Sequence, residues 1–194
     1  MNLWRMLTRK VQKVFWIYLS DIFFVYPENS LATVRPKVAC DFVAITLENC
    51  ARVRDFRDNE LAAEFREKLI RGEKGFFAVN DGKMVGSIWA TVNEGSVPLV
   101  ARGFMRLIPG EALIHDIVTS ANHRGFGIGP FMVVQISEIL FRHWRIRRII
   151  IDVNVKNISS LRMMNKAGLR AQQKALAISA FEKLVFHKVI ANYV

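Results

Sequence analysis

The segment that most constrains the fold is Arg124-Gly125-Phe126-Gly127-Ile128-Gly129, because it separates two stretches of different periodicity. Residues 111–119 show the alternation of a half-buried strand, and residues 128–142 carry apolar side chains at helical spacing. Glycines let backbone N–H groups approach an anion, and a helix N-terminus adds about half a positive charge. The segment therefore predicts a phosphate-binding turn inside an α/β or α+β domain.

Spacing excludes two common phosphate loops. A dinucleotide fingerprint G-x-G-x-x-G that starts at Gly125 needs a glycine at position 130, where the chain has Pro130. The Gly-Lys-Ser/Thr ending of a P-loop is also missing. The pattern that remains is R-x-x-G-x-G between a strand and a helix.

This pattern, with a second motif about 30 residues downstream, resembles the GNAT superfamily of N-acyltransferases. The first motif is Arg124, Gly127 and Gly129, and the second is Asn157, Ser160, Gly168 and Leu169. The resemblance covers about residues 40–192. It implies a mixed, bent central sheet of about seven strands with a splayed parallel pair and helices on both faces. It also implies transfer of an acetyl or other acyl group from acyl-CoA to a primary amine by direct attack, without a metal.

A catalytically inactive CoA-binding module of the same fold is the alternative. The resemblance assigns Ile117, Val118 and Thr119 on the strand to contacts with the pantetheine arm of the cofactor. A backbone N–H near Ile117 or Val118 would polarise the thioester carbonyl. Pro130 removes one N–H donor that the loop usually offers. The assigned residues are Ile117, Val118, Thr119, Arg124, Gly125, Phe126, Gly127, Ile128, Gly129, Asn157 and Ser160.

A general base must take a proton from an amine that is mostly ammonium at neutral pH, and Glu111, His115 and Asp116 are the candidates on the entering strand. Strand alternation puts Glu111, Leu113, His115, Ile117 and Thr119 on one face. Glu111 also stands where the histone-acetylating branch of the family has its acidic base. The alternatives are a solvated strand end for Glu111 and a hydrogen-bonded core histidine for His115.

Met164 stands where many family members carry a tyrosine that protonates the departing thiolate. A thioether cannot donate a proton. The pKa of a free thiol is about 8.5, so a CoA thiolate can leave without a dedicated acid. No residue is therefore assigned as the general acid that protonates the CoA thiolate.

Periodicity and turn signals place the other elements, and an Asp81-Gly82 turn joins two of the strands. The irregular connection 94–110 is the candidate substrate loop. Residues 1–30 are expected to be a basic aromatic extension, followed by an acyltransferase domain at 31–194. Strands are expected at 41–46, 75–79, 83–89, 111–119 and 148–155 with two more after 169, and helices at 47–55, 59–71, 128–142 and 157–166.

The extension has the composition of a helix at a membrane surface, because Arg5, Arg9, Lys10 and Lys13 precede clustered aromatic residues. Ser20-Asp21 interrupts its apolar run, which argues against a signal peptide or a transmembrane helix. Residues 1–26 are thus a candidate segment for peripheral contact with the inner face of a membrane. The alternative is a helix packed on the domain or on a second copy in a homodimer. The segment resembles the N-terminal stretch of GNAT proteins in envelope-polysaccharide pathways. This resemblance implies a sugar-linked or lipid-linked amine as the acceptor, and a free small-molecule amine is the other candidate.

Charge and cysteine content narrow the class of partner and the compartment. The formal net charge of +11 favours anionic partners, but no nucleic-acid recognition motif occurs, so nucleic acid is not expected. Cys40 and Cys50 fit neither a disulfide framework nor a zinc site, which points to a reducing cytoplasm.

Overall fold

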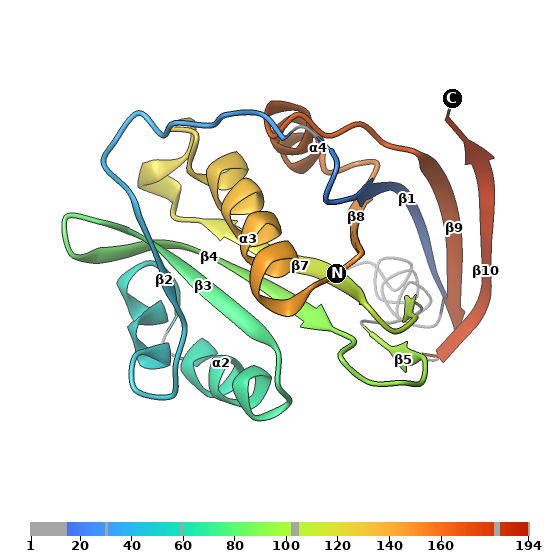
Figure 1. The fold of residues 1–194 in the computed structure, drawn as a ribbon, viewed down its shortest axis with the longest axis horizontal. Coiled ribbons are helices and arrows are strands. Elements are labelled where there is room, and N and C mark those ends of the chain that lie inside the picture. Colours follow the sequence, from blue (N-terminus) through green and yellow to red (C-terminus); the bar gives the residue numbers. More distant parts are fainter. Residues whose placement is uncertain (1–14, 30, 59, 102–104, 181–182, 194) are drawn as a thin grey trace, which may run out of the picture.

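The computed structural model describes residues 15–29, 31–58, 60–101, 105–180 and 183–193. Its main feature is an eight-stranded mixed sheet in the order β10-β9-β1-β8-β7-β4-β3-β2 (Figure 1). A separate two-stranded hairpin, β5–β6, lies in the connection that leads into β7. The strands are β1 Phe15–Val25, β2 Asp41–Ala44, β3 Lys74–Asn80, β4 Lys83–Val92, β5 Leu99–Val100, β6 Arg106–Leu107, β7 Glu111–Thr119, β8 Arg148–Asn154, β9 Gln173–Ala180 and β10 Lys183–Asn192.

Helices cover both faces of the sheet. On one face, α3 and α4 pack over the largest apolar cluster, which includes Ile88, Ile114 and Ile151. On the other face, η1 and α2 cover β3 and β4, where Phe65 of α2 meets Phe77 and Trp89. The helical segments are η1 Cys50–Asp55, α2 Leu61–Ile70, η2 Ala121–His123, α3 Ile128–Trp144 and α4 Ile158–Lys166. Within the described part of the chain, no helix is both long and apolar enough to span a membrane.

The N-terminal segment differs from the expectation. Residues 15–25 form a strand, β1, and not a helix, and this strand lies inside the sheet between β8 and β9. Its side chains alternate, so that Phe23 and Val25 join the cluster under α3 while Ile22 and Phe24 face the opposite side. Residues 1–14, which carry the basic half of the predicted extension, lie outside the described residues. We therefore propose that one structural unit begins no later than residue 15.

Most of the other predicted elements are confirmed, with shifted ends. Glu111–Thr119 is a strand as expected, and Asp81 and Gly82 form the predicted hairpin turn with φ values of 49° and 71°. The predicted helix over 47–55 is only a 3₁₀ segment, Cys50–Asp55. The predicted irregular connection 94–110 contains the short β5–β6 hairpin, whose neighbours Ala101 and Met105 pack on the sheet. The main sheet has eight strands where about seven were expected, because β1 joins it.

The parallel pair β7 and β8 sets the position of the site. Its register runs from Glu111↔Arg148 to Ile114↔Ile151 and then stops, although both strands continue. Beyond Ile114, the edge of β7 that faces β8 has no partner strand in the register. The strands therefore diverge, as the resemblance implied, and open the sheet at its centre.

Candidate active site

The glycine segment forms a tight turn into α3. Gly125 and Gly127 have φ values of 83° and 84°, a region that side chains with a Cβ rarely adopt. Gly127 is the N-cap of α3, and no side chain caps the helix. The first N–H groups of this 17-residue helix are therefore available to an anion, except at Pro130, which has none.

A cavity of about 640 Å³, the loop cavity, surrounds this turn. It brings together the predicted residues of the strand end, the glycine segment and the start of α4, as well as two cationic side chains, Arg162 and Lys166, that the sequence did not single out. A Cβ placed on Gly129 would lie 2.5 Å from Sδ of Met163, so the helix start and α4 are in close contact. The loop cavity is lined by Ile117, Val118, Thr119, Arg124, Gly125, Gly127, Ile128, Gly129, Asn157, Ser160, Arg162 and Lys166, among others.

Phe126 is the one predicted cofactor residue that does not line either cavity around the divergence of β7 and β8. Its carbonyl oxygen accepts a 2.8 Å hydrogen bond from the backbone N–H of Lys37. Asn157 also has a structural contact, because its side-chain oxygen caps α4 by accepting from the N–H of Ser160 at 3.2 Å. Both residues therefore support the shape of the turn.

A second cavity of about 590 Å³, the central cavity, fills the space between the diverging ends of β7 and β8. It shares Ile117, Val118, Asn157, Ser160 and Met163 with the loop cavity, so the two cavities adjoin each other. Both volumes fall in the range of about 300–1,000 Å³ that is typical of ligand sites. One ligand could thus place a phosphate group in the loop cavity and an extended chain in the central cavity between the strands.

The strand that enters the central cavity contains a β-bulge at Asp116. The register with β4 runs from Trp89↔His115 to Ser87↔Val118, so β7 has one extra residue here, and Asp116 has a φ of 48°. The bulge reverses the alternation. Leu113 faces the β5–β6 side, whereas Ile117 packs against the cluster under α3. The prediction that His115, Ile117 and Thr119 share one face is therefore wrong.

A third cavity of about 500 Å³, the outer cavity, lies between α2, β4, β7 and β5. His115 and Asp116 line both the outer and the central cavity, and they form the junction between them. The remaining wall is charged on the α2 side and apolar on the β5 side. It consists of Glu64, Lys68, Arg71, Glu73, Thr91, Leu99, Val100 and Ala101.

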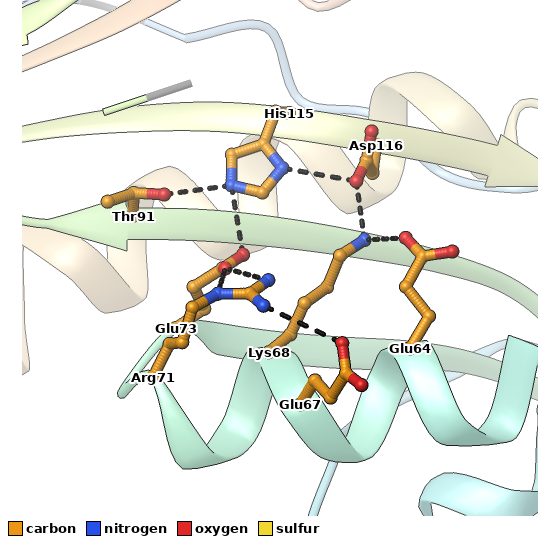
Figure 2. A network of polar contacts seen from close by, with 8 residues as sticks. All are labelled: Glu64, Glu67, Lys68, Arg71, Glu73, Thr91, His115 and Asp116. Carbon is orange, nitrogen blue, oxygen red and sulfur yellow. Dashed lines mark hydrogen bonds and ion pairs between the residues drawn. The ribbon is translucent and has the colours of Figure 1, made fainter. Parts of the chain in front are cut away.

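Polar groups surround the imidazole of His115, whose side chain is only 8% exposed (Figure 2). Its Nε2 lies 3.0 Å from Oγ1 of Thr91 and 3.4 Å from Oε2 of Glu73, and its Nδ1 lies 3.4 Å from Oδ2 of Asp116. Glu73 in turn accepts hydrogen bonds from Arg71, and these bonds raise the pKa of the Arg71 guanidinium above its usual value. A carboxylate thus stands near each ring nitrogen.

Glu111, the other predicted base, lies at the opposite end of β7 from this junction. It is four positions from His115 in the chain, which is about 13 Å along a strand. Its carboxylate is buried, accepts a 2.6 Å hydrogen bond from Nε of Arg148, and accepts a second bond from the N–H of Ile108 at 2.9 Å. Glu111 is therefore neither a solvated strand end nor a lining residue of the three cavities, and its contacts are those of a structural ion pair.

We expect Glu111→Gln to lower stability and leave chemistry nearly unchanged. The substitution removes the negative charge that Arg148 contacts, and a hydrogen bond to a charged group contributes about 1.5–3 kcal/mol. Chemical denaturation should show a loss of about that size in the free energy of unfolding. The rate of the acyl transfer that the resemblance implies, measured well below the melting temperature, should stay within a factor of about three of the wild-type rate, since that factor corresponds to under 1 kcal/mol. A stable variant with a large loss of rate would restore Glu111 as the base.

Several residues of the site gave no signal in the sequence. Lys68, Glu73 and Thr91 come from α2, the following turn and β4, and only the packing of α2 on the sheet brings them to His115. Tyr18 of β1 lines the central cavity, which also contains the fully buried Met164. Because β1 was expected to be outside the domain, Tyr18 was missed with it.

Comparison with known families supports the resemblance found in the sequence. The family described as "Acetyltransferase (GNAT) family" matches residues 43–169, which is more than half of the chain. The match begins at β2 and ends just after α4, so it contains the loop, central and outer cavities except for their contacts with β1. A search of curated proteins gave no significant match.

Solved structures of the same fold include three acetyltransferases. A GCN5-related N-acetyltransferase from Kribbella flavida has 12% identity and a TM-score of 0.56, with 89% of this chain and 62% of that chain covered. A tandem GNAT protein of the clavulanic acid biosynthesis pathway has 13% identity and a TM-score of 0.58, with coverage of 93% and 59%. A GNAT-family acetyltransferase from Colwellia psychrerythraea has 12% identity and a TM-score of 0.59, with coverage of 90% and 60%. This chain spans about three fifths of the length of each, and at these identities the likeness concerns the fold.

Proposed function

Since the chain belongs to the GNAT acetyltransferase family, we propose that it transfers an acetyl or other acyl group from acyl-CoA to a primary amine. The observation that carries this proposal is the row of three adjoining cavities. It runs from the glycine turn at α3, between β7 and β8, to His115 and Asp116, and then into the outer cavity. A donor and an acceptor that enter from opposite ends would meet at this junction.

The donor end of the path suits CoA. The positive-φ glycines and the uncapped N-terminus of α3 offer N–H groups to a pyrophosphate, and Arg124, Arg162 and Lys166 line the same cavity. The narrow space between β7 and β8 suits the pantetheine arm, because the free edge of β7 presents backbone groups from His115 onward. An N–H of this edge would hydrogen-bond the thioester oxygen as negative charge develops on it.

The chemistry is direct attack of the amine on the thioester carbon. His115 and Asp116 together act as the base that removes a proton from the incoming ammonium, since both line the cavity junction. The neutral amine then forms the C–N bond, the C–S bond breaks, and CoA leaves as a thiolate. The extra proton that remains on the acylated nitrogen passes to this thiolate, which gives the neutral amide and the free CoA thiol. A covalent acyl-cysteine is not needed, because Cys40 and Cys50 line none of the three cavities and partial burial raises the pKa of the Cys40 thiol.

The acceptor is a small-molecule or sugar-linked amine that fits the outer cavity. Its charged wall on α2 and its apolar wall at Leu99 and Val100 allow an acceptor with both polar and apolar parts. The rival is a domain that binds CoA without catalysis. Met164 supports this alternative, because it replaces the tyrosine that protonates the thiolate in many family members. The buried His115 at the junction supports the enzyme.

Initial-rate kinetics test the proposed mechanism. Thiol release is followed while acetyl-CoA and an amine, chosen from a panel of amino sugars, polyamines and amino acids, are varied together. Direct attack requires both substrates to be bound at once, so double-reciprocal plots should intersect. Parallel lines would instead indicate an acyl-enzyme and would contradict direct attack.

A further inference from the structure

We infer that Lys68 of α2 is a positioning residue for acyl transfer, which fixes the carboxylate of Asp116 and, through it, the imidazole of His115. This inference rests on the function proposed above and extends its machinery to an element outside both sequence motifs. The supporting observations are the burial of Lys68, its two carboxylate partners and the bulge that turns Asp116 toward it.

Lys68 is a buried cation at the edge of the outer cavity. Its side chain is 6% exposed, and lysine is rarely buried to that degree unless it is paired. The aliphatic chain and ammonium group lie against aromatic rings, with Nζ 5.5 Å from the centre of Phe65 and 5.2 Å from that of Trp89. Burial and ring contacts thus hold the ammonium group in one place.

The ammonium group points at the cavity junction (Figure 2). Nζ lies 2.5 Å from Oδ2 of Asp116 and 2.9 Å from Oε1 of Glu64. The same oxygen of Asp116 is 3.4 Å from Nδ1 of His115. Lys68 therefore contacts the one carboxylate oxygen that also faces the imidazole, and it fixes that oxygen's position.

The bulge at Asp116 explains why this contact exists. A regular strand would turn residue 116 away from the face that carries His115. The positive φ of Asp116 instead lets adjacent residues, His115 and Asp116, reach the same ion-pair network. Such a backbone conformation is uncommon outside glycine, although Asp adopts it more readily than most residues, and the ion pair with Lys68 favours it here.

The charge of Lys68 also sets the charge balance at the base. The titratable and charged groups around His115 and Asp116 come from β1, α2, the turn after α2 and β8: Tyr18, Glu64, Lys68, Arg71, Glu73 and Asp152. Lys68 pairs with Asp116 and Glu64, while Arg71 pairs with Glu73. Without Lys68, Asp116 would lose the cation that lies 2.5 Å from its carboxylate, while the carboxylates of Glu64 and Glu73 would stay nearby. The base would then remain protonated to higher pH.

Substitution with a pH profile tests the inference. We expect Lys68→Met to move the acid limb of kcat/KM upward by about 1 pH unit or more, as expected for loss of an opposite charge within about 6 Å. kcat should fall about 10- to 100-fold through lost positioning, while the Kd for CoA stays unchanged. Lys68→Arg keeps the charge and should keep the wild-type limb. Lys74→Met is the matched control, because Lys74 also pairs with a carboxylate and an aromatic ring, Glu94 and Trp144, but lines none of the three cavities.

A second readout separates failure of this inference from failure of the proposed function. The ring signals of His115, titrated by NMR, should have their midpoint at higher pH in Lys68→Met than in the wild type, whether or not any amine is acylated. If Lys68→Met does not fold, Lys68→Gln removes the charge, keeps a donor to Asp116 and should give the same shift. An unchanged midpoint and an unchanged acid limb in a folded, charge-free variant would overturn the inference. The expected shift in Lys68→Met, together with a wild-type protein that acylates no amine, would overturn only the proposed function.

Discussion

Gly127→Val is expected to abolish measurable binding of CoA at micromolar concentrations while the protein remains folded. Gly127 has a φ of 84°, and a β-branched residue strongly disfavours that region. The turn would have to change shape, which would move the N–H groups before α3 away from the pyrophosphate. Each hydrogen bond to a charged group contributes about 1.5–3 kcal/mol. Loss of a pair of them raises the Kd by about 100-fold or more.

Calorimetric titration of CoA measures this effect, and Gly82→Val provides the control. Gly82 also has a positive φ, 71°, but it lies in the β3–β4 hairpin, and nothing within 4 Å would meet its Cβ. Both variants should lose similar conformational stability. Only Gly127→Val should lose the cofactor. If it binds CoA as tightly as Gly82→Val, the glycine turn is not the phosphate site.

His115→Ala has the second large expected effect, this time on turnover. Removal of a general base at neutral pH lowers the rate by about 10²–10⁴-fold. The Kd for CoA should stay at the wild-type value, because His115 does not line the loop cavity. His143→Ala, at the exposed end of α3, controls for the loss of an imidazole elsewhere.

Comparison with Asp116→Asn shows which of the two candidates, His115 or Asp116, accepts the proton. If His115 accepts the proton, Asp116→Asn should cost less than His115→Ala, and the double variant should be close to His115→Ala alone. Transfer that proceeds at the wild-type rate in His115→Ala would remove His115 from the mechanism. A loss confined to Asp116→Asn would make the carboxylate the base.

The sequence predicted the parts of the fold that local rules determine. Alternation along Glu111–Thr119, the turn at Asp81-Gly82 and the helical spacing after Ile128 each gave an element that the structure confirms. The glycine turn and the start of α4 were predicted to lie together, and they line one cavity. These features depend on neighbours in the chain or on motifs with fixed spacing.

Two errors arose where the outcome depends on distant contacts. The alternation of β7 predicts a common face for His115 and Ile117, but an extra residue at Asp116 reverses it, and nothing in the sequence indicates the bulge. The aromatic run of β1 was assigned to a helix outside the domain. Its apolar residues on both sides suit a strand buried between β8 and β9 equally well.

The role of Lys68 illustrates the same limit at the level of one side chain. Lys68 was not singled out from the sequence, because a lysine four residues after a glutamate on a helix is an ordinary surface pattern. Burial against Phe65 and Trp89 and the contact with Asp116 require α2 to pack across β4 and β7. Glu111 shows the converse, since its position in the family motif suggested a base, whereas its pairing with Arg148 depends on the β7–β8 register.

Amine-dependent thiol release from acetyl-CoA, with mass analysis of the amine product, tests the central claim most directly. We predict that at least one class of primary amine in the panel gains the mass of an acetyl group in step with thiol release, and that Gly127→Val and His115→Ala both suppress the reaction. CoA binding to the wild type without amine-dependent thiol release for any acceptor would contradict the claim and leave a CoA-binding module.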